Sequence, residues 1–343
     1  MLPPLRDEPA LLVTIKTIHE AIRAEVVAAC TRSSADDLSR VTGKQAGDVI
    51  YAVDRVSEQL LVDRFSALAE KWPCVLVAEG LGVNGRRMLP AGMPEHKAEI
   101  VALVDPIDGT RGLMYQKRPA WILTGIAPYR GGGETLADIR LAVQTEIPLV
   151  KQNLCDTIWA IAGSGAHGER FDRVTGARRP LALRPSRATT IDQGFGGVTR
   201  FFPGARAELA AIDDEVVEAV LGPTVKGRAL AFEDQYISNA GELYELAVGH
   251  DRWVAELRPL IEPVLARRGR ALGICSHPYD LSTELIAREA GVLVTAPSGR
   301  RLSAPLDVFT NIAFMAYANE AIRSQVEPPL RAALRARGLL PEG

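Results

Sequence analysis

The stretch from Val101 to Thr110, Val-Ala-Leu-Val-Asp-Pro-Ile-Asp-Gly-Thr, constrains this chain more than any other. Ile100–Val104 contains no polar residue, which predicts a short strand buried on both faces. Pro106 cannot donate a hydrogen bond to a neighbouring strand, so we expect the strand to end there. Asp105 and Asp108 would then lie at the mouth of a buried strand.

The residues after this strand have the chemistry of a polar site. Asp108 is a natural N-cap for a following helix, and Gly109 lets the backbone approach a ligand closely. The N–H groups of Gly109 and Thr110 would face the same space as the two acids, so cations and phosphate could meet there. An ordinary strand-turn-helix corner, with Asp105 as turn residue and Asp108 as cap, is equally compatible with these residues alone.

The composition predicts a globular protein with two packed lobes. Of the 343 residues, 47% are hydrophobic and 24% are charged. The formal net charge of -2 gives no large basic field, so we expect neither nucleic acid nor an anionic membrane as partner. The apolar runs are too short to span a bilayer, and Met1-Leu-Pro-Pro lacks a signal-peptide pattern, which predicts a cytoplasmic protein. The four cysteines are scattered, which argues against disulfides and zinc.

Two further acids follow extended segments in the first part of the chain. Apolar residues recur at helical spacing over Leu11–Val26 and predict an N-terminal amphipathic helix. The segment from Asp48 to Asp54 is extended in character, and Asp54 would begin the next helix as its N-cap. The apolar run before Glu79 predicts a strand that also ends in an acid. Carboxylates at neighbouring strand ends repel unless a cation lies between them, and a divalent cation is the usual solution.

The middle of the chain continues the sheet and then passes to a second lobe. Residues 121–128 and 139–148 have strand composition. The glycines of residues 163–168 resemble a phosphate loop, but the Lys-Ser/Thr ending is missing, so a hairpin is favoured. A polar, proline-broken stretch follows and predicts two lobes, residues 1–185 and 186–343.

The second lobe alternates helical and strand-like segments, which is typical of α/β folds. A helix is predicted after the capping residue Ser238, and strands at residues 271–275 and 292–295. Asp280 precedes a helix that runs to Ala290. It thus occupies a helix start beside a strand end, as predicted for Asp108.

The residues 105–110, Asp-Pro-Ile-Asp-Gly-Thr, resemble the signature of the inositol monophosphatase family, within the larger group that includes fructose-1,6-bisphosphatases and bisphosphate nucleotidases. Asp48, Asp54 and Glu79 follow the order and approximate spacing of that family upstream. Residues 280–291 resemble its second signature. The resemblance covers most of the chain and implies a layered αβαβα sandwich.

The resemblance also implies an activity, Mg²⁺-dependent phosphomonoester hydrolysis by a lithium-sensitive homodimer with two or three bound Mg²⁺ ions. Thr110 and Asp54 match the pair that orients and deprotonates the attacking water, and the amides of Gly109 and Thr110 match those that hold phosphate. We also predict substrate contacts at Ser238, Asn239 and Ala240. The implied metal ligands are Glu79, Asp105, the carbonyl of Ile107, Asp108 and Asp280.

The sequence departs from the family pattern at four positions. Gly80 stands where the family has a second Glu, which puts one metal site and the lithium sensitivity in doubt. Tyr279 replaces a Trp, and Lys44 lies one position from the family's site lysine. Gly273 stands where a Glu contacts inositol hydroxyls.

The sequence is therefore compatible with several substrate classes. The leading hypothesis is a small polyol or sugar phosphate, with inositol monophosphate first. The alternatives are a fructose-1,6-bisphosphatase, a 3'(2'),5'-bisphosphate nucleotidase, and a catalytically silent regulatory protein that binds metal or phosphate. A second phosphate would need further cations. The candidates for that role are Arg111, Lys117, Arg118, Arg300 and Arg301.

Overall fold

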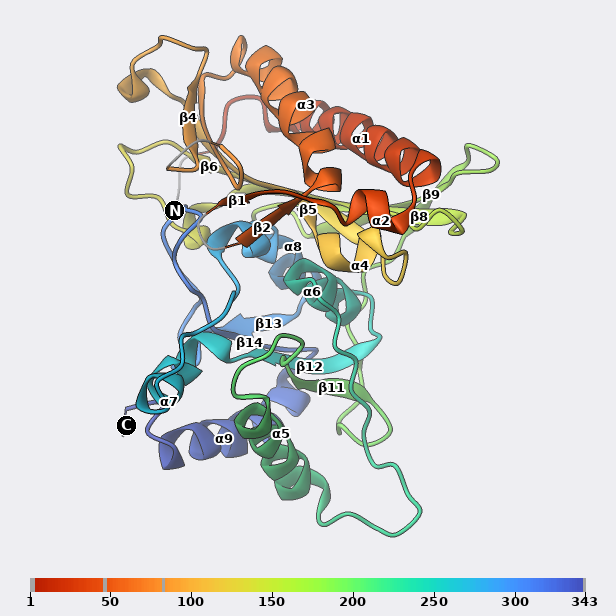
Figure 1. Cartoon of the computed structure of the whole chain (residues 1–343), viewed down its shortest axis with the longest axis vertical. Helices are drawn as coiled ribbons and strands as arrows, with labels where there is room; N and C mark the ends of the chain where they lie inside the picture. The colour runs from red at the N-terminus through yellow and green to blue at the C-terminus, as the bar shows by residue number, and fades with distance from the viewer. Residues whose placement is uncertain (1–3, 46–47, 82–83, 342–343) are drawn as a thin grey trace.

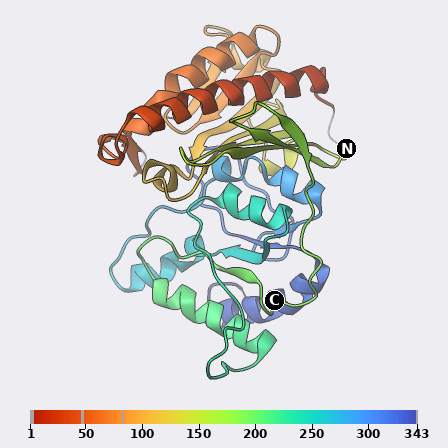
Figure 2. The ribbon, with the colours of Figure 1, turned by 90° about the vertical axis from the view of Figure 1, so that its right-hand side faces the viewer.

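The computed structural model describes residues 4–45, 48–81 and 84–341, and for residues 42–58 it describes the backbone alone. Within these residues the chain forms a large and a small β-sheet, separated and flanked by helices (Figure 1). The view turned by 90° shows the same stack of layers (Figure 2).

The large sheet belongs to the first part of the chain. Its strand order is β10-β9-β8-β7-β6-β5-β3-β4. Strands β3 and β5 are parallel, and all other neighbours are antiparallel. The strands are β3 (Cys74–Ala78), β4 (Arg86–Leu89), β5 (Ile100–Asp108), β6 (Ala120–Pro128), β7 (Leu141–Ile147), β8 (Leu154–Ile161), β9 (Ala166–Asp172) and β10 (Arg178–Leu181).

Helices α1 (Glu8–Arg32) and α3 (Ala52–Ala69) cover the outer face of this sheet. The apolar residues of α1 that were predicted to share one face, from Leu11 to Val26, are buried against the sheet, which confirms the amphipathic helix. The short helix α2 (Ala35–Leu38) and the hairpin of β1 (Val41–Gln45) and β2 (Asp48–Tyr51) connect the two helices.

The small sheet belongs to the second part of the chain, with the order β11-β12-β14-β13. Its strands are β11 (Phe195–Val198), β12 (Asp251–Glu256), β13 (Leu293–Thr295) and β14 (Phe314–Tyr317). Helices α6 (Asn239–Ala247) and α8 (Glu284–Ala290) lie between the two sheets, and α5 (Arg206–Leu221) and α9 (Glu320–Ala336) cover the far face. This is the layered αβαβα sandwich predicted from the sequence.

The remaining described elements are short. They are the helices α4 (Thr110–Met114) and α7 (Glu262–Arg267) and the 3₁₀ turns η1 (Glu95–Lys97), η2 (Leu136–Asp138), η3 (Arg258–Ile261) and η4 (Pro278–Leu281). Among the described helices, none combines the length and the apolar character that crossing a bilayer requires. The four cysteines are buried free thiols.

Several predicted element boundaries are wrong. Strand β5 continues through Pro106 to Asp108, because a bulge after Asp105 accommodates the missing proline donor. Helix α3 begins at Ala52, so Asp54 lies inside the helix and not at its start. Residues 271–275 form no strand.

Of the two predictions about the middle of the chain, the hairpin is confirmed and the lobe boundary is not tested. The glycines of residues 163–168 fall in and beside the turn of the antiparallel pair β8–β9, which confirms the hairpin. The polar stretch after it contributes β10 to the large sheet before the chain reaches β11. The division into lobes at residue 185 stays a prediction.

A buried histidine joins α1 to the large sheet. The ring nitrogens of His19 lie 3.0 Å from the hydroxyl of Thr145 and 2.8 Å from that of Thr124, and the side chain is fully buried. Burial and, to a smaller extent, the charge of Arg23 together lower the pKa of His19 from 6.5 to about 3. The folded protein therefore holds this histidine neutral where the unfolded chain would protonate it.

We predict that His19 makes the fold less stable as pH falls. A base whose pKa is lower in the folded than in the unfolded protein contributes stability when the pH is above its unfolded pKa of 6.5. That contribution is lost as the pH falls toward the folded pKa of about 3. Wild-type protein should lose about 2 kcal/mol from this residue between pH 8 and pH 5. Urea unfolding at both pH values should show this loss reduced in His19→Gln and retained in His96→Gln, whose ring is exposed. Equal losses in wild type and His19→Gln would contradict the assignment.

Candidate active site

The parallel pairing of β3 and β5 brings two acids together. Ala78, the last residue of β3, is the partner of Val104 in β5. Glu79 and Asp105 are the next residues of their strands, and parallel strands end at the same edge of a sheet. The strand pairing thus brings Glu79 and Asp105 to one edge of the sheet, and both line the same cavity.

A bulge at the end of β5 shapes the turn that follows. Asp105 pairs with Leu123 and Asp108 with Trp121, so two residues of β5 lie opposite one residue of β6, and β5 carries one extra residue here. Oδ1 of Asp105 accepts a hydrogen bond from the N–H of Ile107 at 2.9 Å. The hydroxyl of Thr110 donates to the carbonyl of Ile107 at 2.8 Å.

Gly109, and not Asp108, is the N-cap of α4. Its φ of 92° is left-handed, a conformation that residues with a side chain rarely adopt. A Cβ at this position would lie 3.3 Å from both the carbonyl oxygen of Ile237 and the Cβ of Ser238. The glycine thus allows the turn to pack directly on the segment before α6, and the side chain of Asp108 is left to other partners.

Those partners come from the second part of the chain. Oδ2 of Asp108 accepts hydrogen bonds from the hydroxyl of Ser238 at 2.7 Å and the N–H of Ala240 at 3.0 Å. The Ser238 hydroxyl also accepts from the N–H of Gly241, so it caps α6 as predicted. These hydrogen bonds hold one carboxylate oxygen of Asp108 in place. The substrate contacts expected of Ser238 and Ala240 stay predictions.

Asp280 reaches the same place on η4. It lies in this 3₁₀ turn and not at the start of α8, and its Oδ2 accepts from the N–H of His277 at 2.6 Å. The turn packs tightly on the large sheet, because a Cβ on Gly125 of β6 would lie 2.3 Å from the carbonyl oxygen of Ser282. A glycine in β6 therefore brings Asp280 close to the end of β5.

Asp105, Asp108 and Asp280 form a triad of acids, in which Asp105 and Asp108 are buried and Asp280 is half-buried. Each offers a carboxylate oxygen, and these oxygens lie within 4.8 Å of one another. Burial raises the pKa of Asp105 well above 3.8, and the charges of Asp108, Asp280 and Glu79 raise it further. Burial raises the pKa of Asp108 to about 7. Burial and the charge of Asp108 also raise the pKa of Asp280.

The triad fits a divalent cation. Three largely buried carboxylates this close repel one another when ionised, and a cation between them removes that cost. Oxygen donors are the ligands that Mg²⁺ prefers. Backbone and hydroxyl donors hold one oxygen of each carboxylate, which orients the groups as metal ligands are usually oriented. The identity and number of the ions stay predictions.

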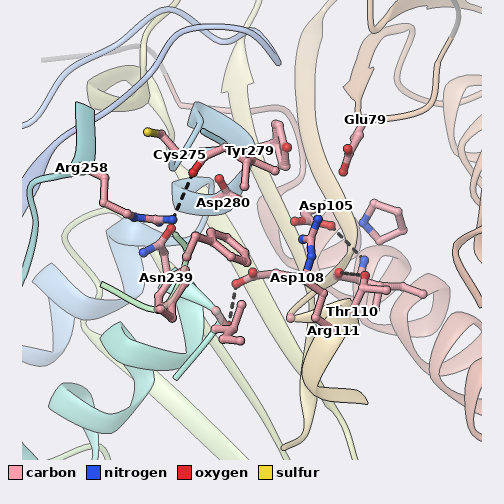
Figure 3. A pocket seen from close by; sticks show the side chains of 18 of the residues that line it. Glu79, Asp105, Asp108, Thr110, Arg111, Asn239, Arg258, Cys275, Tyr279 and Asp280 are labelled. Atoms are coloured by element: carbon pink, nitrogen blue, oxygen red, sulfur yellow. Dashed lines mark hydrogen bonds between the residues drawn. The ribbon is translucent and has the colours of Figure 1, made fainter. Parts of the chain in front are cut away.

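The triad lies in a cavity of about 100 Å³. Figure 3 shows Glu79, Asp105 and Thr110 on one side of this cavity, and Arg258 and Asn239 on the other. Ala240 contributes its backbone N–H to Asp108. The side chains of Lys44, Asp48 and Asp54 lie outside the part of the chain whose side chains the structure describes. The predicted site residues that line the cavity are Glu79, Asp105, Ile107, Asp108, Gly109, Thr110, Ser238, Asn239 and Asp280.

The cavity residues that the sequence analysis missed include Phe201, Phe202 and Arg258. A strand that ends in Glu256-Leu-Arg258 resembles the acid-bearing strand ends, and that pattern could have marked the arginine. Of the cations considered for a second phosphate, Arg111 lines the cavity. The described walls do not include Lys117, Arg118, Arg300 or Arg301.

Comparison with known proteins supports the fold. No family model matches the chain, and no curated protein matches its sequence. Solved structures do match. SuhB, an extragenic suppressor protein of Bartonella henselae, is 17% identical with a TM-score of 0.63, over 94% of this chain and 98% of that chain. Fructose-1,6-bisphosphatase of Leishmania major is 14% identical with a TM-score of 0.67, over 97% and 95%.

An inositol monophosphatase of Anabaena is 16% identical with a TM-score of 0.59, over 96% of this chain and 97% of that chain. These likenesses extend over nearly the whole of each chain. The protein therefore has the fold of the inositol monophosphatase and fructose-1,6-bisphosphatase superfamily, as its sequence motifs predicted.

The raised pKa values predict how a cation changes stability with pH. An acid whose pKa is higher in the folded than in the unfolded protein stabilises the fold when the pH is below its unfolded pKa of 3.8. This stabilisation is lost as the pH rises through the folded pKa, which is about 7 for Asp108. The metal-free protein should therefore lose stability from the triad between about pH 5 and pH 8. Added Mg²⁺ should raise the urea midpoint more at the higher pH.

The measurement is urea unfolding in EDTA and in Mg²⁺ at both pH values. Asp108→Asn should reduce the Mg²⁺ effect, because it removes one of the converging charges. Asp63→Asn, which changes an exposed carboxylate on α3, should retain it. A Mg²⁺ effect that is the same at both pH values would count against a cation at the triad.

Proposed function

We propose that this protein is a Mg²⁺-dependent phosphomonoester hydrolase that acts on a small polyol or sugar phosphate. The observation that carries the proposal is the triad of Asp105, Asp108 and Asp280 beside Thr110 in one cavity. Such a site concentrates oxygen ligands for cations next to a hydroxyl and backbone N–H groups. The superfamily fold and the two sequence signatures support the same conclusion.

In this proposal each residue has a defined task. The triad, Glu79 and the carbonyl of Ile107 hold the cations, and the N–H groups of Gly109 and Thr110 bind phosphate oxygens. When bound, Mg²⁺ supplies positive charge that lowers the pKa of water and offsets negative charge on the phosphoryl group and the leaving oxygen. Thr110 orients the attacking water.

Asp54 accepts the proton from that water as its oxygen bonds to phosphorus. The P–O bond to the leaving group breaks, and the alkoxide takes a proton from solvent. The products are an alcohol and inorganic phosphate. The fixed carboxylates and N–H groups contribute by holding the reacting groups in place.

Inositol 1-phosphate is the first substrate to test, because the resemblance names it. Gly273, which replaces an inositol-contacting Glu of the family, does not line the described cavity. A missing polar partner weakens selectivity among hydroxyl patterns without removing the binding of phosphate. We therefore propose a looser preference among polyol phosphates than the family norm. A homodimer is proposed on the resemblance alone, and light scattering tests it.

We predict that Asp108→Asn folds but loses activity by a factor on the order of 10² to 10³. The amide keeps the volume of the side chain and can still accept from Ser238, but it is a poor ligand for a shared cation position. Steady-state hydrolysis of inositol 1-phosphate with Mg²⁺ measures the loss, and Asp63→Asn is the matched control. Activity within about threefold of wild type would overturn the metal assignment.

Lithium should inhibit hydrolysis at fixed Mg²⁺. Gly80, in place of a second Glu, lowers the negative charge around the cations and should weaken the inhibition. Replacement of Gly80 by Glu tests this point, although its φ of 86° strains any side chain. A lithium titration of wild type that shows no inhibition would contradict a family-like metal arrangement, while circular dichroism checks that the variant folds.

A catalytically silent protein is the rival from another class. Absence of turnover on a panel of phosphate esters with Mg²⁺, together with retained Mg²⁺ stabilisation, would favour that rival.

A further inference from the structure

The cavity wall contributed by the second part of the chain carries a fixed arginine. Arg258 follows β12, and its side chain is only 7% exposed. Its Nε–H lies 2.9 and 2.8 Å from the two oxygens of Glu256, which is fully buried, and Nη2 donates to Glu256 as well. Nη1 donates to the carbonyl of Ile274 at 3.1 Å. The pair thus holds the guanidinium in one orientation.

This arrangement leaves donors for a ligand. Arginine has five N–H donors. The bonds that Arg258 makes to Glu256 and Ile274 within the described residues use one N–H on each nitrogen, so each terminal nitrogen keeps a second. Because the guanidinium lines the cavity, these remaining donors suit an oxyanion that the ligand supplies.

Two phenylalanines hold this arginine and a second one. The guanidinium of Arg258 lies 4.3 Å from the ring centre of Phe201 and 5.2 Å from that of Phe202. The guanidinium of Arg111, which comes from α4, lies 5.0 Å from the ring centre of Phe202. One aromatic pair therefore brings two cations from opposite parts of the chain to the same cavity.

The backbone of this aromatic pair is itself anchored. Arg206, at the start of α5, donates to the carbonyl of Phe201 at 2.7 Å and to that of Phe202 at 3.0 Å. Thr199 donates to the buried Glu242, which also accepts from Asn239 in the cavity wall. Since arginines already contact the rings, the rings serve as supports for cations more than as a stacking surface for a base.

We propose that Arg258 and Arg111 bind a second oxyanion, carried by the part of the substrate that leaves as the alcohol. The inference rests on the proposed phosphatase function and names its substrate class, compact phosphate esters that also carry a carboxylate or a second phosphate. A guanidinium held in place loses little entropy on binding, and an ester without the second anion leaves its donors unpaired.

The test compares neutral and acidic leaving groups. The substrates are glycerol 2-phosphate and inositol 1-phosphate, 3-phosphoglycerate for the carboxylate, and fructose 1,6-bisphosphate for the second phosphate. We expect at least one acidic ester to exceed both neutral esters in kcat/KM by about tenfold or more. The acidic ester that is preferred identifies the source of the oxyanion.

Variants separate recognition from damage to the fold. Arg258→Gln should lower the ratio of kcat/KM for the acidic ester over glycerol 2-phosphate by about tenfold, mainly through KM. Because this change leaves Glu256 buried without its cation, the double variant Glu256→Gln/Arg258→Gln and the single variant Arg111→Gln repeat the test. Arg118→Gln is the matched control, since Arg118 lies 4.9 Å from the ring centre of Tyr236 and pairs with Asp234 away from the cavity.

The outcomes distinguish the two proposals. Turnover without preference for an acidic ester, or variants that lower all substrates equally, would overturn the second-oxyanion site and leave the phosphatase intact. No turnover of any ester with Mg²⁺ would overturn the proposed function and this inference with it. A falling ratio in the Arg111 and Arg258 variants, with the Arg118 variant unchanged, supports the site.

Discussion

The mutual repulsion of carboxylates in a buried space is the constraint on which this structure depends. Parallel pairing of β3 and β5 places Glu79 beside Asp105, and the bulge that follows adds Asp108. Asp280 joins them from the second part of the chain, within 4.8 Å. Burial makes the ionised form of each acid costly, and every added charge increases that cost. A bound cation offsets this cost, so the arrangement of the acids fits a metal site.

The rest of the fold holds this unfavourable cluster in place. The two sheets meet through α6 and α8, and two glycines permit the contact: Gly109 against the segment before α6, and Gly125 against the carbonyl of Ser282. Hydrogen bonds from Ser238 and Ala240 then join Asp108 to α6. The acidic corner is therefore built by both parts of the chain, and neither part alone would carry the complete set of acids.

Much of this could be predicted because the signals were local. A run of apolar residues that ends in acids, glycine and a hydroxyl indicated both the strand and the site, and the order of the signatures indicated the layered fold. The errors were also local. Proline was expected to end β5, but a bulge tolerates it, and Asp108 was expected to cap a helix, but its carboxylate bonds across the molecule instead. Arg258 was missed because its place in the cavity depends on its contact with Phe201, which is far away in the sequence.

The most direct test of the account is to locate the cations themselves. Crystals grown with Mn²⁺, a scattering substitute for Mg²⁺ that takes the same oxygen ligands, would show its position by anomalous diffraction. The account predicts strong anomalous peaks between Asp105, Asp108 and Asp280, with ligand distances of about 2.0 to 2.2 Å, and their loss from crystals of Asp108→Asn. A structure at saturating Mn²⁺ with no peak at the triad would contradict it.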